Sequence, residues 1–238
     1  MGLPTIAVPK YTLTVPSSGQ QIEYRPFLVK EEKILLLANE SKDEKEQIRA
    51  MKQAIENCTF SKVDVNTLAS FDVEYLFLKL RSKSVGETVE VGVKCSECET
   101  NCPTTIDLST VEVNFNPKFT NRIALTETIG VLMRYPTYED MSKISDAQKK
   151  EDNNSVMDFV ASCIDKIYDG QQVYNTADFT KQEVLNFLDE LSQSSLKRIM
   201  SFFELMPVLQ KEIKVICKKC NKESEVMLKG AQSFFQSV

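Results

Sequence analysis

Four of the seven cysteines form two Cys-x-x-Cys pairs, and their spacing is typical of metal ligands. Cys95 and Cys98 make the first pair, and Cys217 and Cys220 make the second, more than a hundred residues later. Two residues between ligands let a tight turn direct both sulfurs at one point. Two such turns supply the tetrahedral set of four sulfurs that zinc accepts at about 2.3 Å. The sequence therefore predicts one structural Zn²⁺ shared by the two pairs.

Other interpretations of the cysteines stay open at this stage. The four thiols could be reduced and metal-free, and Cys102 could replace Cys98 as a ligand, although its spacing is poorer. A redox dithiol is disfavoured because neither pair lies between a strand and a long helix. The first residues lack the basic stretch and apolar core of a secretory signal, so we expect a reducing compartment, where such pairs usually bind metal. Cys58 and Cys163 fall on apolar helical patterns and are expected in the core.

Charge around the second pair allows two functional interpretations. Four thiolates around one divalent cation leave a net charge of about −2. Lys214, Lys218, Lys219 and Lys222 surround this pair and could offset that charge. Lys218, Lys219 and Lys222 are also the only support for an alternative function, a zinc-ribbon nucleic-acid-binding protein. The net charge of −5 argues against a general nucleic-acid-binding protein, because such proteins usually carry an excess of basic residues that neutralise phosphates.

The segments that flank the two pairs alternate between apolar and polar residues, as strands do. Val91 and Val93 precede the first pair, and Ile213 and Val215 precede the second. Alternation resumes after each pair, so each unit is predicted to be a strand, a metal-binding turn and a strand. We expect the hairpins, at residues 88–113 and 209–229, to meet in a zinc-ribbon-like subdomain.

The remaining pattern is mainly helical, which predicts an α+β fold in a single domain, residues 1–238. Residues 10–28 are predicted to form an N-terminal β-hairpin, and helices within 41–83 and 155–206 are predicted to form the core. Residues 70–82 are apolar almost all round, which is typical of a central buried helix.

Capping signals and polar segments set the expected boundaries. Ser41 with Glu44 and Thr180 with Glu183 have the spacing of capping boxes. Ser155 and Asp158 are expected to begin a helix that buries apolar residues as far as Ile167 and ends at Gly170. Residues 122–135 are predicted to form a short strand or helix, and the polar stretch 138–154 a loop with one helical turn.

Composition argues against an enzyme and against a membrane protein. The chain has no His, which excludes every mechanism built on a Ser–His or Cys–His pair. Four sulfur ligands would saturate a zinc ion and leave no position for substrate or water. Glu139, Asp140, Glu151 and Asp152 lie in a polar stretch without a partner pattern. No apolar run is long enough to span a membrane, and no membrane partner is expected.

Several segments together resemble the baseplate (hub) assembly chaperones of T-even-type tailed bacteriophages. The resemblance covers most of the chain and is carried by the opening Met-Gly-Leu-Pro-Thr, residues 24–36 (YRPFLVKEEKILL), residues 71–87 (FDVEYLFLKLRSKSVGE), the two Cys-x-x-Cys hairpins and the final Phe234-Phe235. The helix followed by Lys-Ser-Val-Gly-Glu is the most specific of these segments.

The resemblance implies a non-catalytic protein that binds baseplate hub proteins and delivers or protects them during contractile-tail assembly. The resemblance implies a location in the host bacterial cytoplasm. It does not imply that the protein is part of the mature virion. Phe234 and Phe235 are candidates for an exposed partner-binding anchor, and their alternative is packing back on the core.

Overall fold

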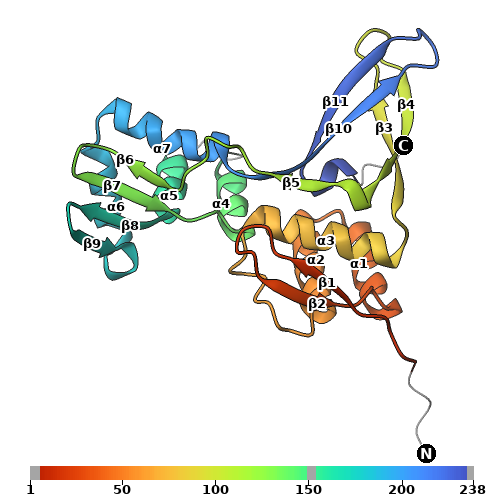
Figure 1. Ribbon diagram of the computed structural model, residues 1–238, viewed down its shortest axis with the longest axis horizontal. Helices are drawn as coiled ribbons and strands as arrows, with labels where there is room; N and C mark the ends of the chain where they lie inside the picture. Colours follow the sequence, from red (N-terminus) through yellow and green to blue (C-terminus); the bar gives the residue numbers. More distant parts are fainter. Residues whose placement is uncertain (1–5, 149–153, 235–238) are drawn as a thin grey trace, which may run out of the picture. The chain divides into compact units, whose positions relative to one another are not determined.

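The computed structural model describes residues 6–148 and 154–234, and the chain folds as two compact units (Figure 1). The first unit combines Met1–Asn114 with Val208–Val238, and the second is Phe115–Pro207. The structure is mixed α and β, as predicted. The helices expected to share one core lie in different units, and each unit has an apolar cluster of its own. The second unit can form its own core because its helices pack with a four-stranded sheet, of which the sequence indicated only a short strand or helix at residues 122–135.

The first unit begins with an antiparallel hairpin and three helices and continues into paired strands. Its elements are β1 (Tyr11–Thr14), β2 (Gln21–Tyr24), α1 (Val29–Ser41), α2 (Glu44–Cys58), α3 (Ser70–Ser84), β3 (Thr88–Lys94), β4 (Asn101–Asp107), β5 (Glu112–Asn114), β10 (Val208–Ile216) and β11 (Glu223–Lys229), with 3₁₀ turns at Leu108–Thr110 and Ala231–Phe234. The predicted N-terminal hairpin and both cysteine hairpins are confirmed.

The central helix of the first unit is α3, as its continuous apolar pattern predicts. Leu76, Leu78 and Leu80 are fully buried.

The predicted cap of α2 is wrong. Asp43, and not Ser41, caps this helix, and its carboxylate accepts a hydrogen bond from the N–H of Lys45. Ser41 ends α1 because the chain turns at Lys42, whose φ of 56° is left-handed.

The two cysteine hairpins share one apolar core. The strand β3 pairs with β4, and β10 pairs with both β11 and β5. Inward-facing residues of all four hairpin strands form one buried cluster, which includes Val91, Ile106, Ile213 and Leu228, together with Leu78 of α3. The hairpins are thus held together below their tips by burial of apolar surface.

The second unit is an antiparallel sheet, in the order β6-β7-β8-β9, with four helices among its described residues. The last three helices contribute to one apolar cluster with the sheet, and the first lies beside the second. Its elements are β6 (Arg122–Ala124), β7 (Ile129–Met133), α4 (Tyr138–Gln148), α5 (Asn154–Ser162), β8 (Ile164–Asp169), β9 (Gln172–Asn175), α6 (Lys181–Asp189) and α7 (Gln193–Leu205), with a 3₁₀ turn at Thr176–Asp178. The predicted capping box of Thr180 and Glu183 is confirmed at the start of α6.

Two predictions for the second unit are wrong. Residues 138–148 form a helix and not a loop. For residues 122–135, predicted as a short strand or helix, the strand is correct, and the segment forms two strands. The helix expected to run to Gly170 ends at Ser162, and Ile164 and Ile167 lie on β8. These residues are spaced for a helix face, but pairing of β8 with both β7 and β9 satisfies their backbone groups instead. Gly170 forms the left-handed turn that joins β8 to β9 (φ 59°).

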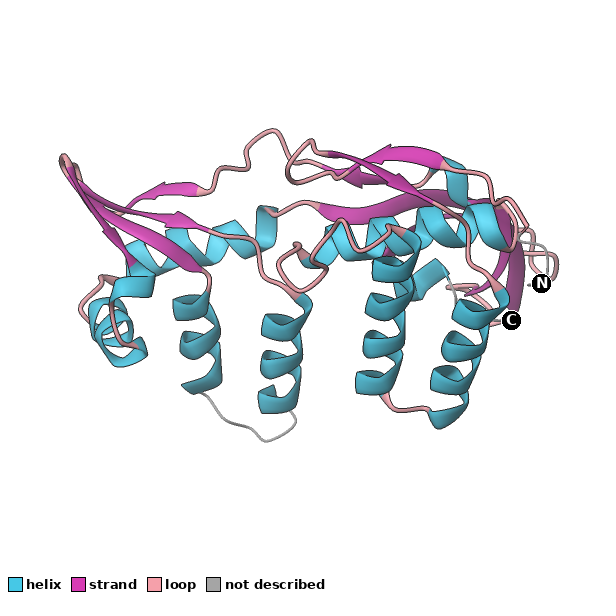
Figure 2. Cartoon of the chain, turned by 90° about the horizontal axis from the view of Figure 1, so that it is seen from below, coloured by secondary structure: helices cyan, strands magenta, loops and turns pink. Residues whose placement is uncertain are grey.

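Both units contain the same local motif: a β-hairpin, an arginine, two helices side by side, and a buried cysteine. In the first unit the helices are α1 and α2, and in the second they are α4 and α5 (Figure 2). The N–H of Arg25 donates to the carbonyl of Cys58 at 3.0 Å, and the N–H of Arg134 donates to the carbonyl of Cys163 at 2.8 Å.

The arginine of each motif binds a carboxylate six residues later. Arg25 pairs with Glu31 at 3.0 and 3.1 Å, and Arg134 pairs with Asp140 at 2.8 and 3.2 Å. Burial disfavours the charged form of Glu31, but hydrogen bonds from Arg25 and from the N–H of Leu28 outweigh it, so the pKa of Glu31 is lowered. The pKa of Asp140 is lowered by the same balance. Each pair thus clamps the chain between hairpin and first helix.

Candidate metal centre

The two cysteine turns have matching backbone geometry at the tips of their hairpins. In the first, the N–H of Cys95 donates to the carbonyl of Thr100 and the N–H of Glu99 donates to that of Cys95, at 2.9 and 3.0 Å. In the second, Cys217 with Lys222 and Asn221 with Cys217 form the same two bonds, both at 2.9 Å.

The residue after each second cysteine is left-handed in both turns. Glu99 has a φ of 54°, and Asn221 has a φ of 55°. This conformation lets each turn close with both sulfurs on one side, and Asn adopts it more readily than Glu does. The first turn therefore carries more backbone strain than the second.

The structure brings all four predicted sulfur ligands together. The Sγ atoms of Cys95, Cys98, Cys217 and Cys220 all lie within 4.8 Å of one another. Cys95 to Cys220, Cys98 to Cys217 and Cys98 to Cys220 are separated by 3.6, 3.5 and 3.6 Å. A tetrahedron with metal–sulfur bonds of about 2.3 Å has sulfur–sulfur edges of about 3.8 Å. The cluster thus has the size of a four-sulfur metal site.

The surroundings of the sulfurs favour thiolates at some positions and oppose them at others. Backbone N–H groups of Cys220 and Lys219 donate to Cys217 and lower the pKa of its thiol to about 6. The N–H of Lys222 favours the thiolate of Cys220, but burial and the neighbouring sulfurs raise its pKa to about 12. Four adjacent thiolates repel one another, and a divalent cation at their centre would remove that repulsion.

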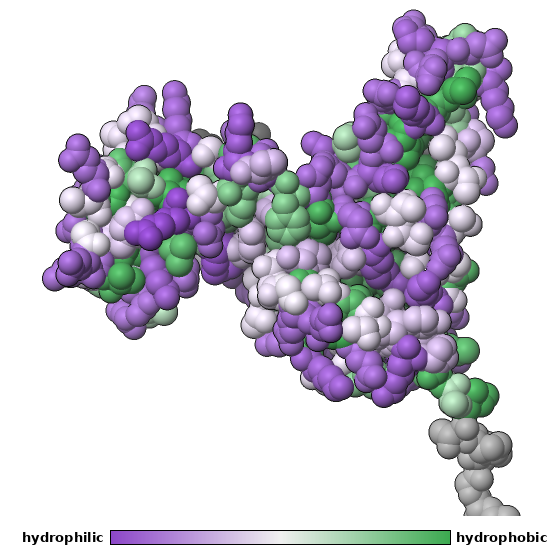
Figure 3. All heavy atoms as spheres, in the orientation of Figure 1, coloured by the Kyte–Doolittle hydropathy of each residue, from purple (hydrophilic) through white to green (hydrophobic). Residues whose placement is uncertain are grey.

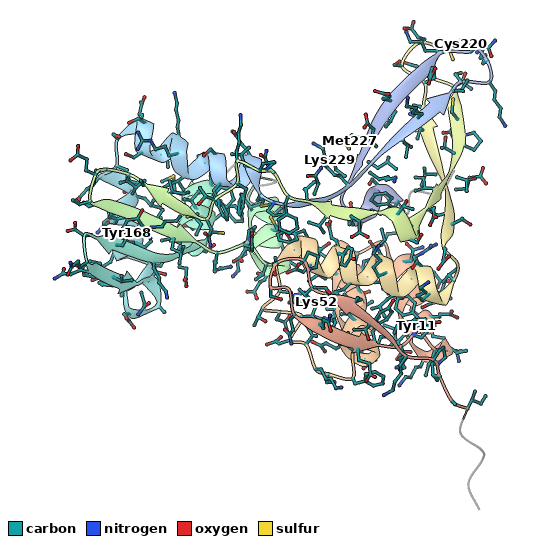
Figure 4. The ribbon with its side chains drawn as sticks, in the orientation of Figure 1. Tyr11, Lys52, Tyr168, Cys220, Met227 and Lys229 are labelled. Carbon is teal, nitrogen blue, oxygen red and sulfur yellow. The ribbon has the colours of Figure 1, made fainter. Side chains whose placement is uncertain are left out.

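The cluster lies at the boundary between the shared apolar core and solvent. Cys95 and Cys217 are buried, Cys98 is half-buried and Cys220 is exposed. Figure 4 shows Cys220 at the hairpin tip, and Figure 3 shows mainly hydrophilic residues around that tip. A contact that the sequence did not indicate supports the first turn: the Thr100 hydroxyl lies 3.3 Å from the sulfur of Cys98 and lowers its pKa.

Two of the lysines near the second pair form ion pairs with carboxylates. Lys222 binds Glu97 of the opposite turn at 3.1 Å, and Lys214 binds Glu225 of the neighbouring strand at 3.4 Å. The first of these pairs joins the two hairpins across the cluster. These contacts reduce the basic surface on which nucleic-acid binding would depend, so that function is not favoured.

The other cysteines lie outside the cluster of ligands. Cys102 is buried in the apolar core on β4, with its sulfur 3.5 Å from the carbonyl of Thr100. Cys58 and Cys163 are fully buried, and burial raises the pKa of each thiol to about 11. Both were expected in the core on apolar helix faces. Cys58 ends α2 on the same face as the buried Met51 and Ile55, whereas Cys163 lies just beyond the end of α5.

The other residues that the sequence offered as candidates for partner binding or catalysis have a structural role wherever they are described. Phe234 is fully buried in the core beneath the cysteine hairpins, which agrees with packing on the core and not with an exposed anchor. Phe235 lies outside the described residues, as do Glu151 and Asp152. Asp140 belongs to the arginine clamp, and Glu139 pairs with Lys143 one helical turn away. No helix among the described residues is both long and apolar enough to cross a membrane.

Comparison with known proteins gives one match. A family model described as T4 bacteriophage base plate protein matches residues 8–236. No curated protein and no solved structure matches the chain. The family match covers both units and all four clustered cysteines.

Proposed function

Because this chain belongs to the family of T4 bacteriophage base plate proteins, we propose that it is a non-catalytic assembly chaperone for the baseplate hub. In this role it binds hub subunits during assembly of the contractile tail and delivers or protects them. The family match over both units is the observation that carries the proposal. In this proposal the protein acts in the host bacterial cytoplasm, where tail parts are made.

The absence of a catalytic arrangement among the described residues supports a binding role. The chain has no His, and the buried carboxylates Glu31 and Asp140 are each paired with an arginine. Asp72 is also buried, and it accepts a hydrogen bond from the N–H of Ser17 at 2.9 Å. These groups therefore serve the fold and are not available to transfer protons to a substrate.

The metal proposed for the cysteine cluster is Zn²⁺, held by Cys95, Cys98, Cys217 and Cys220. Tetrahedral thiolate sets of this size are typical of structural zinc, and they leave no open position for a substrate. The ion supplies positive charge at the centre of four thiolates and thereby links the two hairpins. The second unit lies in the chain between the two cysteine pairs, so the link also closes that segment into a loop.

The proposed mechanism is transient cover. The protein holds an aggregation-prone face of a hub subunit and leaves when the neighbouring subunit docks. The first unit, stiffened by the metal and by the clamp of Arg25 and Glu31, provides a rigid body for this contact.

Co-expression with the baseplate hub proteins of its own phage, followed by affinity capture of the tagged chain, tests the proposal. We expect at least one hub protein to be retained and its soluble fraction to rise at least severalfold. A tagged, unrelated acidic protein of similar size is the control. Retention of none of the hub proteins would contradict the chaperone function.

A filter-binding assay at low and moderate salt tests the alternative. Phosphate contacts would give binding that weakens steeply with salt. We expect no such binding, and a steep salt slope at micromolar protein would instead support the zinc-ribbon nucleic-acid function.

A further inference from the structure

The outward face of α1 carries large apolar side chains that nothing in the described chain covers. Val29, Leu36 and Leu37 are 65%, 63% and 67% exposed, while only Glu31 and Ala38 of this helix are buried. Residues seven and eight apart lie on one side of a helix, so these three side chains form a stripe two turns long. Such a stripe in water is typical of a surface that binds another protein.

The repeated motif shows that the fold itself does not require this stripe. When the clamp of Arg25 and Glu31 is aligned with that of Arg134 and Asp140, Leu36 and Leu37 correspond to Ser145 and Asp146 of α4. The same hairpin and helix pair therefore form in this chain with polar residues at both positions. The leucines of α1 are thus free to serve an interaction.

The charges on this face are complementary to a second copy of the same face. Lys33 and Glu40 are exposed on the outward side of α1, three residues before Leu36 and three after Leu37. In an antiparallel pair of α1 helices related by a two-fold axis between Leu36 and Leu37, Lys33 of each copy faces Glu40 of the other. Interfaces of this kind must be self-complementary, and this pattern meets that condition.

We propose that α1 is a homodimerisation surface, on which two copies of this chain pack antiparallel. The leucines of the two copies meet at the centre and lose contact with water. The two Lys33–Glu40 pairs lie at the ends, where they fix the register and the antiparallel direction. A parallel pairing would place like charges opposite each other and is disfavoured.

The size of the face sets the expected strength of the dimer. A helix of 13 residues is about 20 Å long. Two such faces would bury on the order of 800 Å² in total, which is below the usual range for stable interfaces. We therefore expect a reversible dimer with a dissociation constant in the micromolar range, on the order of 10 to 100 μM.

Sedimentation velocity of the full chain over roughly 2 to 500 μM tests this proposal. We expect a reversible shift from monomer to dimer. Lys33→Glu and Glu40→Lys should each weaken the dimer about tenfold or more, because each turns two attractive contacts into two repulsive ones. The double variant K33E/E40K should regain dimerisation. Mixing the two single variants should produce heterodimers, since every contact between them is again attractive.

A second pair of variants separates the leucine contact from the general loss of an exposed apolar residue. Leu36→Ser should weaken the dimer at least tenfold. Val173→Ser, at a 60% exposed position on β9 of the other unit, should leave it unchanged. Circular dichroism spectra and melting curves should match wild type for all these surface variants.

Three outcomes would overturn the proposal. A chain that stays monomeric to 500 μM would do so, as would a dimer that is insensitive to Leu36→Ser, or single charge variants that fail to complement each other. If the chain is monomeric and Leu36→Ser abolishes capture of a hub protein, α1 is instead a docking face for that protein. The assembly function proposed above does not depend on the dimer, so the two can fail separately.

Discussion

Among single residues, Cys217 gives the sharpest test of the metal centre. Its sulfur is buried, accepts two backbone hydrogen bonds and lies 3.5 Å from Cys98. Cys217→Ser should lower the zinc content from about one ion per chain to nearly none after dialysis against a weak chelator. The neutral hydroxyl of serine is a much weaker zinc ligand than a thiolate, which is the ligand of four-sulfur sites. Elemental analysis and colorimetric titration measure the change.

Cys102→Ser is the matched control for that experiment. Cys102 is buried on β4 near the cluster but contributes no ligand in the structure. The variant should keep one zinc per chain, with some loss of stability from placing a hydroxyl in an apolar core. Loss of zinc in this variant, and its retention in Cys98→Ser, would show that Cys102 is the ligand in place of Cys98.

The buried pair of Arg25 and Glu31 makes stability depend on pH in a defined direction. Burial opposes the charge on Glu31, but Arg25 and the N–H of Leu28 outweigh it and lower its pKa below the ordinary 4.5. The pair therefore contributes fully at pH values above 4.5. Its contribution is lost as the pH falls through the lower pKa of the folded state.

Glu31→Gln should consequently cost about 3 kcal/mol of unfolding free energy at pH 7, because it leaves Arg25 buried without its partner charge. The difference from wild type should shrink at pH 3. Urea unfolding at the two pH values measures it. The half-buried neighbour Glu32 is the control, and Glu32→Gln should change stability by less than about 0.5 kcal/mol. An equal loss at both pH values would show that shape, and not charge, is what Glu31 provides.

At the scale of elements, Gly130 of β7 is required for the sheet of the second unit. A Cβ at this position would overlap the phenol ring of Tyr168 on the paired strand β8 and would lie 2.5 Å from the carbonyl oxygen of Ile123 on β6. Tyr168, labelled in Figure 4, crosses Gly130 and stacks under Arg122, whose guanidinium lies 4.5 Å from the ring. The absence of a side chain lets three strands pack at this crossing.

Gly130→Ala should therefore destabilise the second unit by about 2 to 3 kcal/mol, since it overpacks a closed site. Thermal unfolding followed by circular dichroism measures the loss. Tyr168→Ala in the same background should recover only part of it, because the contact with the Ile123 carbonyl persists. Gly19→Ala is an unsuitable control because its φ is 70°. Ala124→Gly, at an exposed position on β6, is the control, because it measures the effect of exchanging Gly and Ala in a strand without overpacking.

At the scale of the whole molecule, the two units should respond differently to removal of the metal. The cysteine cluster belongs to the first unit, while the second has its own sheet and its own apolar cluster. A chelator should therefore raise amide hydrogen exchange by at least tenfold at the two cysteine turns, residues 95–100 and 217–222. Exchange in β7 and β8 should stay unchanged.

The apolar core shared by β3, β4, β10 and β11 explains why the hairpins should not unfold completely in that experiment. Their lower halves are held together by burial, and only the tips depend on the metal. Collapse of protection throughout both units would mean that the two cores are not independent.

The sequence alone determined the parts of this protein whose signals are local. Each Cys-x-x-Cys turn and its alternating flanks lie within about ten residues, so hairpin and ligand type can be inferred together. The capping box at Thr180 and the apolar pattern of residues 70–82 are local in the same sense. The family resemblance was also carried by contiguous segments and is confirmed by the match over residues 8–236.

Only the tertiary structure decided the features that depend on contacts between distant segments. The pattern from Ile164 to Ile167 suits a helix or a strand, and pairing with β7 makes it a strand. The repeated motif could not be recognised because the backbone N–H of each arginine donates to a cysteine carbonyl about thirty residues away. From the sequence, the meeting of the four sulfurs was only an expectation. The packing of β10 beside the first hairpin brings them together. Spacing along the chain sets what a segment can form, and burial against a distant partner selects which form has the lowest free energy.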